Sequence, residues 1–237
     1  MKTILHKAET RGGANHGWLN AKHTFSFANY YDPLRMNFGA LRVLNDDIVA
    51  PSMGFGTHPH DNMEIITIPL SGDLEHKDSM GYTEVVRQND VQILSAGTGI
   101  QHSEKNKNHD QEVRLLQIWV FPKERNIKPS YDQKTFLPEE KYNKMLQIVS
   151  PMGDEKGINI NQDAWFSIGK LDAGFEDTYT LRKKGNGVYA FVIEGDVSID
   201  NQALSRRDGL GISETDSFKI KANGNAELLL MEVPFLY

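Results

Sequence analysis

IPLSGDL (Ile68–Leu74) and FVIEGDV (Phe191–Val197) are two similar stretches, one in each half of the chain. In both halves a polar run containing Arg then leads into a further strand-like segment, RQNDVQI (Arg87–Ile93) in the first and RRDGLGI (Arg206–Ile212) in the second. Similar segments in the same order indicate an internal repeat. The sequence therefore predicts two copies of one fold.

Short apolar runs separated by Gly, Asn, Asp and Pro recur from residue 38 onward. They are FGALRV (38–43), EIITI (64–68), EVVR (84–87), LLQIWV (115–120), WFSIG (165–169), VYAFVI (188–193) and AELLLMEV (226–233). Regularly spaced runs of this kind are typical of the strands of a sandwich or barrel. One short helical pattern lies within residues 136–145 and opens at Pro138.

The chain has 237 residues, of which 39% are hydrophobic, enough for one sizeable core or two small ones. The charged, proline-bounded segment PKERNIKPSY (122–131) is a plausible linker between them. We therefore predict an all-β protein with few short helices, divided into residues 1–130 and residues 131–237.

Charge and composition exclude several classes of function. A formal net charge of -6 argues against nucleic acid or an anionic membrane surface as a partner. The absence of cysteine excludes thiolate metal sites and a cysteine nucleophile. Residues 1–9 have no apolar run of signal-peptide length, and no run of about 18 uncharged apolar residues occurs. We therefore expect a cytoplasmic protein.

All eight histidines precede the linker. Two of them form His58-x-His60, and a third forms His102-x-Glu104. Residues two apart on a strand share a face, so each pair can aim at one point. On neighbouring inward-facing strands, the four side chains would bind a divalent iron, nickel, copper, manganese or zinc ion with one or two positions left open. The alternative is that they are polar residues on the outside of a β protein.

HPHDNME (58–64) and LSAGTGIQHSE (94–104) resemble the two metal-binding motifs of the cupin superfamily in the form used by pirins. HTFSFANYYDP (23–33) resembles the N-terminal segment of short bacterial pirin-like proteins, and the resemblance covers essentially the whole chain. It implies two jelly-roll-like cupin barrels packed face to face, with a metal in the first only. The implied ligands are His58, His60, His102 and Glu104. Glu64 is then a residue near the ligands or a strand-pairing polar residue.

The short bacterial pirin-like proteins are similar to quercetin 2,3-dioxygenases. This resemblance implies a flavonol bound to the metal through its 3-hydroxyl, with Glu104 as the general base. Dioxygen then adds to the activated ring, the heterocycle opens and carbon monoxide leaves. The expected partners are a small aromatic substrate and dioxygen, the expected cofactor is one iron ion, with nickel, copper, manganese, cobalt or zinc as alternatives, and the expected state is a monomer.

Two other functions stay open at this point. The same four ligands would serve a non-catalytic metal-dependent module that binds transcription regulators or enzymes, as proposed for pirins of eukaryotic nuclei. Metal-assisted isomerisation or hydrolysis of a small molecule is the other, because the fold does not fix the reaction.

The remaining histidines and aromatic residues suggest structural roles. His76 in EHKD (75–78) and His109 in NKNHD (106–110) are predicted to be solvated loop residues. RGGANHGW (11–18) lacks the features of a phosphate-binding loop. The aromatic residues Phe25, Phe27, Tyr30 and Tyr31 are predicted to pack in the core and between the halves.

Overall fold

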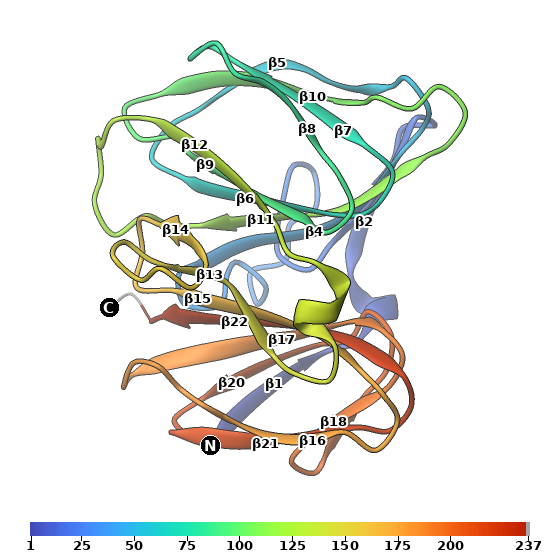
Figure 1. The fold of residues 1–237 in the computed structure, drawn as a ribbon, viewed down its shortest axis with the longest axis vertical. Coiled ribbons are helices and arrows are strands. Elements are labelled where there is room, and N and C mark those ends of the chain that lie inside the picture. The colour runs from blue at the N-terminus through green and yellow to red at the C-terminus, as the bar shows by residue number, and fades with distance from the viewer. Residues whose placement is uncertain (236–237) are drawn as a thin grey trace.

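The structure is a computed structural model that describes residues 1–235 of the chain. These residues form two stacked β-barrels with only two 3-10 helices, η1 (Ala8–Thr10) and η2 (Pro138–Lys141) (Figure 1). The strands of the first half of the chain are β1 (Lys2–His6), β2 (Gly12–Asn15), β3 (Leu19–His23), β4 (Leu41–Val49), β5 (Gly54–His60), β6 (Glu64–Ser71), β7 (Leu74–Asp78), β8 (Thr83–Val86), β9 (Asp90–Ser95), β10 (Ile100–Asn106), β11 (Val113–Val120) and β12 (Ser130–Thr135). Those of the second half are β13 (Leu146–Pro151), β14 (Ile158–Ile160), β15 (Trp165–Leu171), β16 (Glu176–Thr180), β17 (Asn186–Glu194), β18 (Val197–Ile199), β19 (Gln202–Leu204), β20 (Gly209–Ser213), β21 (Ser217–Ala222) and β22 (Ala226–Pro234).

The predicted strands and the predicted helix are found in the structure. All seven apolar runs contribute to strands, although β4 begins at Leu41 and leaves the first three residues of FGALRV outside it. Helix η2 begins at Pro138, where the backbone N–H of Leu137 donates to the Glu140 carboxylate at 2.7 Å. Proline has no backbone N–H. At the first helical position this costs no hydrogen bond, because an N–H there would have no partner within the helix.

The two halves have the same strand order. The first consists of a seven-stranded sheet, β12-β9-β6-β11-β4-β3-β2, and a four-stranded sheet, β5-β10-β7-β8. The second consists of β1-β20-β17-β22-β15-β13-β14 and β16-β21-β18-β19. The repeated segments connect β6 to β7 and β17 to β18, and Gly72 and Gly195 turn the chain there with φ of 76° and 79°, which glycine adopts readily.

One edge strand of each half comes from outside the segment that a division at residue 130 would give. β1 pairs antiparallel with β20, so Lys2–His6 belongs to the sheet of the second half. β12, which begins at Ser130, pairs with β9 in the sheet of the first half. The two strands occupy equivalent edges, and the strand pairing therefore crosses the predicted boundary in both directions.

The two seven-stranded sheets face each other across a shared apolar core, as the face-to-face prediction requires (Figure 1). Alternate residues of β6 and β11, such as Ile66 and Leu116, pack in one cluster with Phe166 of β15 and Leu229 of β22. All four residues are fully buried. Burial of apolar area at this interface stabilises the pair of barrels as one body.

The barrel interiors differ. The second is filled by one continuous apolar cluster that includes Val188, Leu210 and Phe218. The first holds two smaller apolar clusters, one around Val49 and Leu115 and one around Ile65, Leu94 and Ala96. Buried polar side chains of the first half, described below, lie in the same barrel. Among residues 1–235 no helix is long and apolar enough to cross a membrane.

Candidate metal centre

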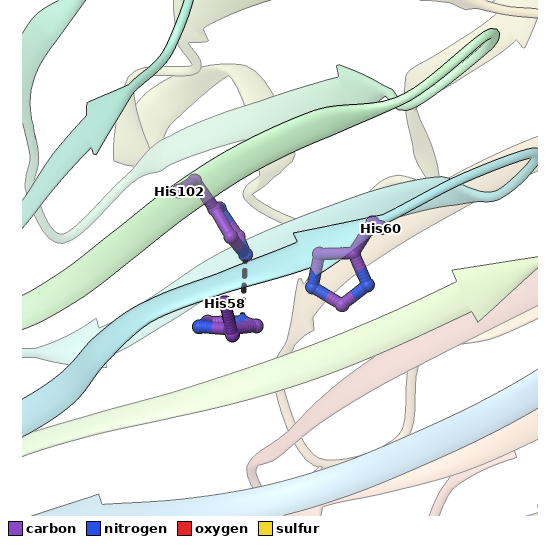
Figure 2. Close-up of side chains that lie close together, drawn as sticks. All are labelled: His58, His60 and His102. Carbon is purple, nitrogen blue, oxygen red and sulfur yellow. Dashed lines mark hydrogen bonds between the residues drawn. The ribbon is translucent and has the colours of Figure 1, made fainter.

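Three of the predicted ligands meet inside the first barrel. His58 and His60 lie on β5, and His102 lies opposite His58 on the paired strand β10. Figure 2 shows the three imidazoles turned toward one another, with the Nε2 atoms of His58 and His102 2.9 Å apart. One ring nitrogen from each histidine lies within 4.8 Å of the others, a grouping that could hold a metal ion. The alternative of outward-facing surface residues is thereby excluded for these three.

The hydrogen bonds around His58 indicate which nitrogen is free. Its Nδ1 lies 2.8 Å from the carbonyl oxygen of Gly56, and a carbonyl only accepts, so Nδ1 carries the proton. Nε2 then presents a lone pair toward His60 and His102. Fixing one ring nitrogen through a backbone carbonyl in this way is common for histidine ligands of metals.

Burial favours the neutral form of His60 and His102. It lowers the pKa of His60 to about 4 and that of His102 to about 2, with a further lowering from the neighbouring histidines. Histidine binds a metal only in its unprotonated form, so the cluster is ready for a cation near neutral pH. Three imidazoles with a carboxylate nearby suit a divalent transition metal, and these donors fit the metal ion that the sequence implies.

Glu104 lies two residues beyond His102 on β10, at 3% exposure. A register shift between these two residues places Glu104 opposite Phe55 of β5. Its carboxylate accepts hydrogen bonds from Nε2 of Gln117 at 2.9 and 3.2 Å and from Oγ1 of Thr67 at 3.4 Å. Burial raises the pKa of Glu104, and the Gln117 hydrogen bond opposes that rise.

A row of polar side chains supports Glu104 from the opposite sheet. It crosses β3, β4, β11 and β6 and consists of His23, Asn45, Gln117 and Thr67, which are cross-strand neighbours. His23 Nδ1 lies 2.9 Å from Asn45 Oδ1, and Thr67 Oγ1 donates to Gln117 Oε1 at 3.1 Å. None of these four residues was predicted from the sequence to belong to the site. Their signal was a polar residue at an inward position of an apolar run, as Gln117 is in LLQIWV.

His76 is not the solvated loop residue that was predicted. It lies on β7 with no solvent exposure, opposite Glu104 on β10. Its Nε2 lies 2.9 Å from Oδ2 of Asp78, and its ring centroid is 5.3 Å from that of His102. The polar residues of EHKD suggested a turn, whereas they alternate between the two faces of a strand. His109 is exposed, as predicted.

Glu64 lies on the other face of its strand. Ile65 and Thr67 of β6 face the interior of the first barrel, so Glu64 faces the second half. There its carboxylate accepts hydrogen bonds from Ser95 Oγ at 2.6 Å and from the backbone N–H of Asn161 at 3.2 Å. Glu64 therefore joins the two halves and does not belong to the histidine cluster.

A cavity of about 230 Å³ opens beside the cluster. His58, His60 and Glu104 line one wall of it. Aromatic residues form much of the rest, and Trp119 packs edge to face on His60 with centroids 4.9 Å apart and on Phe27 at 5.3 Å. Phe27 was predicted to lie in the core; of the same aromatic run, Phe25 is buried between the halves and Tyr31 is 73% exposed. The site combines metal-binding donors with an aromatic pocket.

Family models and related proteins match most of the chain. The pirin family model matches residues 5–120, and the model of the quercetinase C-terminal cupin domain matches residues 147–233. A protein of Escherichia coli named quercetin 2,3-dioxygenase is 43% identical over 230 residues, covering 97% of this chain and 98% of that protein. A pirin-like protein of Caulobacter vibrioides is 42% identical, covering 93% and 95% of the two chains.

The solved structures give the same result. The crystal structure of a bacterial pirin from Escherichia coli in complex with nickel(II) matches with a TM-score of 0.94 and 40% identity, covering 99% of this chain and all of that chain. A quercetin 2,3-dioxygenase of Acinetobacter baumannii, 22% identical, shares the fold with a TM-score of 0.78. The chain therefore belongs to the pirin family, and its two-cupin fold is confirmed.

Proposed function

We propose that this pirin is a metal-dependent oxidoreductase of the quercetin 2,3-dioxygenase type, with flavonols as substrates. The observation that carries the proposal is the convergence of three imidazoles, two of which, His58 and His60, line an aromatic cavity together with Glu104. The names of the relatives from Escherichia coli and other bacteria support it.

In this proposal His58, His60, His102 and Glu104 hold one divalent ion, with iron as the expected metal. Nickel, copper, manganese, cobalt and zinc suit the same ligands, and the related pirin from Escherichia coli binds nickel(II). When bound, the metal lowers the pKa of a hydroxyl group coordinated to it, which favours the anionic form of the flavonol.

Glu104 accepts the proton of the substrate 3-hydroxyl. Burial raises the pKa of this carboxyl in the metal-free protein, and the positive charge of the metal that Glu104 would help to hold acts in the opposite direction. Gln117 and Thr67 hold the carboxylate from the opposite sheet, so its direction is fixed before the substrate arrives. A base held within hydrogen-bond reach of its proton contributes about 10² to 10⁴ to the rate.

The aromatic walls orient the substrate and exclude water. Phe27, Phe55 and Trp119 present apolar surfaces to the cavity, which suits a flat ring system. At about 230 Å³ the cavity is smaller than the ~300 Å³ at which typical ligand pockets begin, so a flavonol would fill it closely. A closely filled cavity keeps bulk water away from the reacting ring.

The test follows quercetin absorbance and carbon monoxide release under oxygen, with iron-loaded and nickel-loaded protein. Metal-dependent turnover is expected, and Glu104→Gln should lower kcat by about 10² to 10⁴. The matched control is Glu64→Gln, which alters a buried carboxyl outside the cluster and should leave kcat close to wild type. Absence of metal-dependent turnover in the wild type, or equal turnover in Glu104→Gln at equal metal content, would contradict the proposal.

A further inference from the structure

Asp47 is a buried carboxylic acid on the cavity wall opposite the histidines. It lies on β4 of the seven-stranded sheet, whereas His58 and His60 lie on β5 of the four-stranded sheet. Its cross-strand neighbours are Ala21 on β3 and Leu115 on β11, neither of which offers a polar side chain. Asp47 is thus the polar member of an otherwise apolar row. This row lies next to the row of polar side chains that supports Glu104.

The carboxyl group of Asp47 has no protein partner among the described residues. The side chain is 5% exposed, and its Oδ1 is buried without a hydrogen bond. Its neighbour Asp46 points the other way and is paired with Arg11 at 3.2 Å and Arg207 at 3.0 Å. An unpaired buried carboxyl is unfavourable, so its presence on a cavity wall indicates a function for it.

We propose that Asp47 is a specificity-determining residue that hydrogen-bonds a second hydroxyl of the substrate, away from the hydroxyl at the metal. The inference rests on the proposed function and adds the substrate class, a polyhydroxylated flat aromatic compound in place of any compound with a single metal-binding hydroxyl.

The state of Asp47 suits a phenolic hydroxyl. Burial, assisted by the negative charges of Asp46 and Glu104, raises the pKa of Asp47 to about 8. At neutral pH the group is therefore largely an uncharged acid, which both donates and accepts a hydrogen bond. A phenolic hydroxyl also does both, and Phe27 and Phe55 line the same cavity and offer apolar surface to the ring that carries it.

The experiment compares two ligands that share the metal-binding group. Quercetin and 3-hydroxyflavone both carry the 3-hydroxyl and 4-keto groups, and 3-hydroxyflavone has no other hydroxyl. Binding to nickel-loaded protein is measured without oxygen from the change in flavonol absorbance, so that no turnover is needed. The wild type should bind quercetin about tenfold or more tightly than 3-hydroxyflavone.

Two variants test the role of Asp47. Asp47→Leu should lose the preference for quercetin while binding 3-hydroxyflavone as well as the wild type does. Asp47→Asn, which still donates and accepts hydrogen bonds, should keep most of the preference and serves if the leucine variant does not fold. Glu64→Gln is the matched control and should keep the full preference, and metal content should be equal in all variants.

The outcomes distinguish failure of the proposed role of Asp47 from failure of the proposed function. A wild type that binds both flavonols without preference, or an Asp47→Leu variant that keeps the preference, would overturn the role of Asp47 and leave the proposed function intact. A wild type that binds neither flavonol would overturn the flavonol proposal and the subsite together.

Discussion

The two barrels are built on one strand order, yet the polar positions around the histidine cluster of the first have mostly apolar counterparts in the second. Aligning Ile68–Leu74 with Phe191–Val197 and following the strand pairings gives the equivalent positions. His58, His60, His102, Glu104 and Gln117 of the first barrel correspond to Tyr179, Leu181, Phe218, Ile220 and Leu230 of the second. Except for Leu181, which is only partly buried, these counterparts lie inside the apolar cluster of the second barrel.

This difference shows what the metal centre costs the fold. The second barrel gains stability from a continuous apolar core. The first replaces five of those positions with groups that must each find a hydrogen bond, a metal or a ligand, because an unpaired buried polar group is unfavourable. Several buried polar atoms in the first half, including Asp47 Oδ1, His102 Nδ1 and Trp119 Nε1, lack a hydrogen-bond partner. In the proposed function the first copy carries the chemistry, while the second contributes apolar packing.

The largest effect is expected when a residue of the first barrel is replaced by its counterpart in the second barrel. His102→Phe places at the centre of the cluster the residue that occupies the equivalent position of β21. Metal content should fall from near one ion per chain to near zero, and flavonol turnover with it, because two imidazoles on one strand bind weakly. Elemental analysis after reconstitution measures the metal. Retention of a full equivalent of metal would show that His102 is not a ligand.

Substitutions at the equivalent positions Phe218 and His102 should differ in their effect on stability. Phe218→Ala removes a fully packed ring from the second barrel and should lower the free energy of unfolding by about 3–5 kcal/mol. His102→Ala, in metal-free protein, should cost far less, since the removed side chain is polar and its Nδ1 has no partner. Urea unfolding of both variants gives the values. Equal losses would mean that both interiors serve stability in the same way.

The buried carboxyl group of Asp47 makes the stability of the protein depend on pH. Its pKa is about 8 in the folded protein, against an ordinary value near 3.8 when unfolded. The folded state therefore holds a proton that the unfolded state releases, and stability from this group is lost as pH rises from about 4 to 8. Asp47→Asn removes the effect, so the variant should gain on the wild type by up to ~1.4 kcal/mol per pH unit in metal-free protein. Parallel stability profiles for the two proteins would contradict it.

The smallest expected effect concerns the positioning of Glu104. Gln117→Leu introduces the residue of the equivalent position on β22 and removes the N–H that holds the Glu104 carboxylate. We expect kcat to fall about tenfold with little change in KM, because the base is misdirected while the cavity keeps its aromatic walls. Steady-state kinetics measure the split, and Gln117→Asn provides a shorter amide as the control. An unchanged kcat would show that Glu104 is positioned without Gln117.

Much of the fold was predictable because it depends on local patterns. Apolar runs and turn residues predicted the strands, and the Gly-Asp pairs of the repeat predicted the duplicated connection through Gly72 and Gly195. The three histidines were predictable because two-residue spacing on a strand aims side chains at one point. The meeting of His102 with the other two depends on the pairing of β5 with β10, which the resemblance to pirins implied and the spacing alone did not.

The supporting residues were harder to predict because their role depends on pairing between distant strands. Gln117 reaches Glu104 only because two sheets close into a barrel, and Glu64 faces away from the cluster because of the face that β6 presents. His76 was assigned to a loop because its neighbours are charged, although alternation along β7 buries it. A polar residue at an inward position of a predicted strand is the signal to use in such sequences.

The position of β1 also constrains how the chain folds. Lys2 pairs with Ser213, so the edge of the second barrel is completed by a strand synthesised long before its partner. That pairing closes a loop of nearly the whole chain, and such distant contacts form slowly. A fragment consisting of residues 131–237 alone would expose the open edge of β20, which invites pairing with another chain. The pairing of β1 with β20 therefore ties the start of the chain to the second barrel. The two barrels depend on each other for correct assembly as well as for stability.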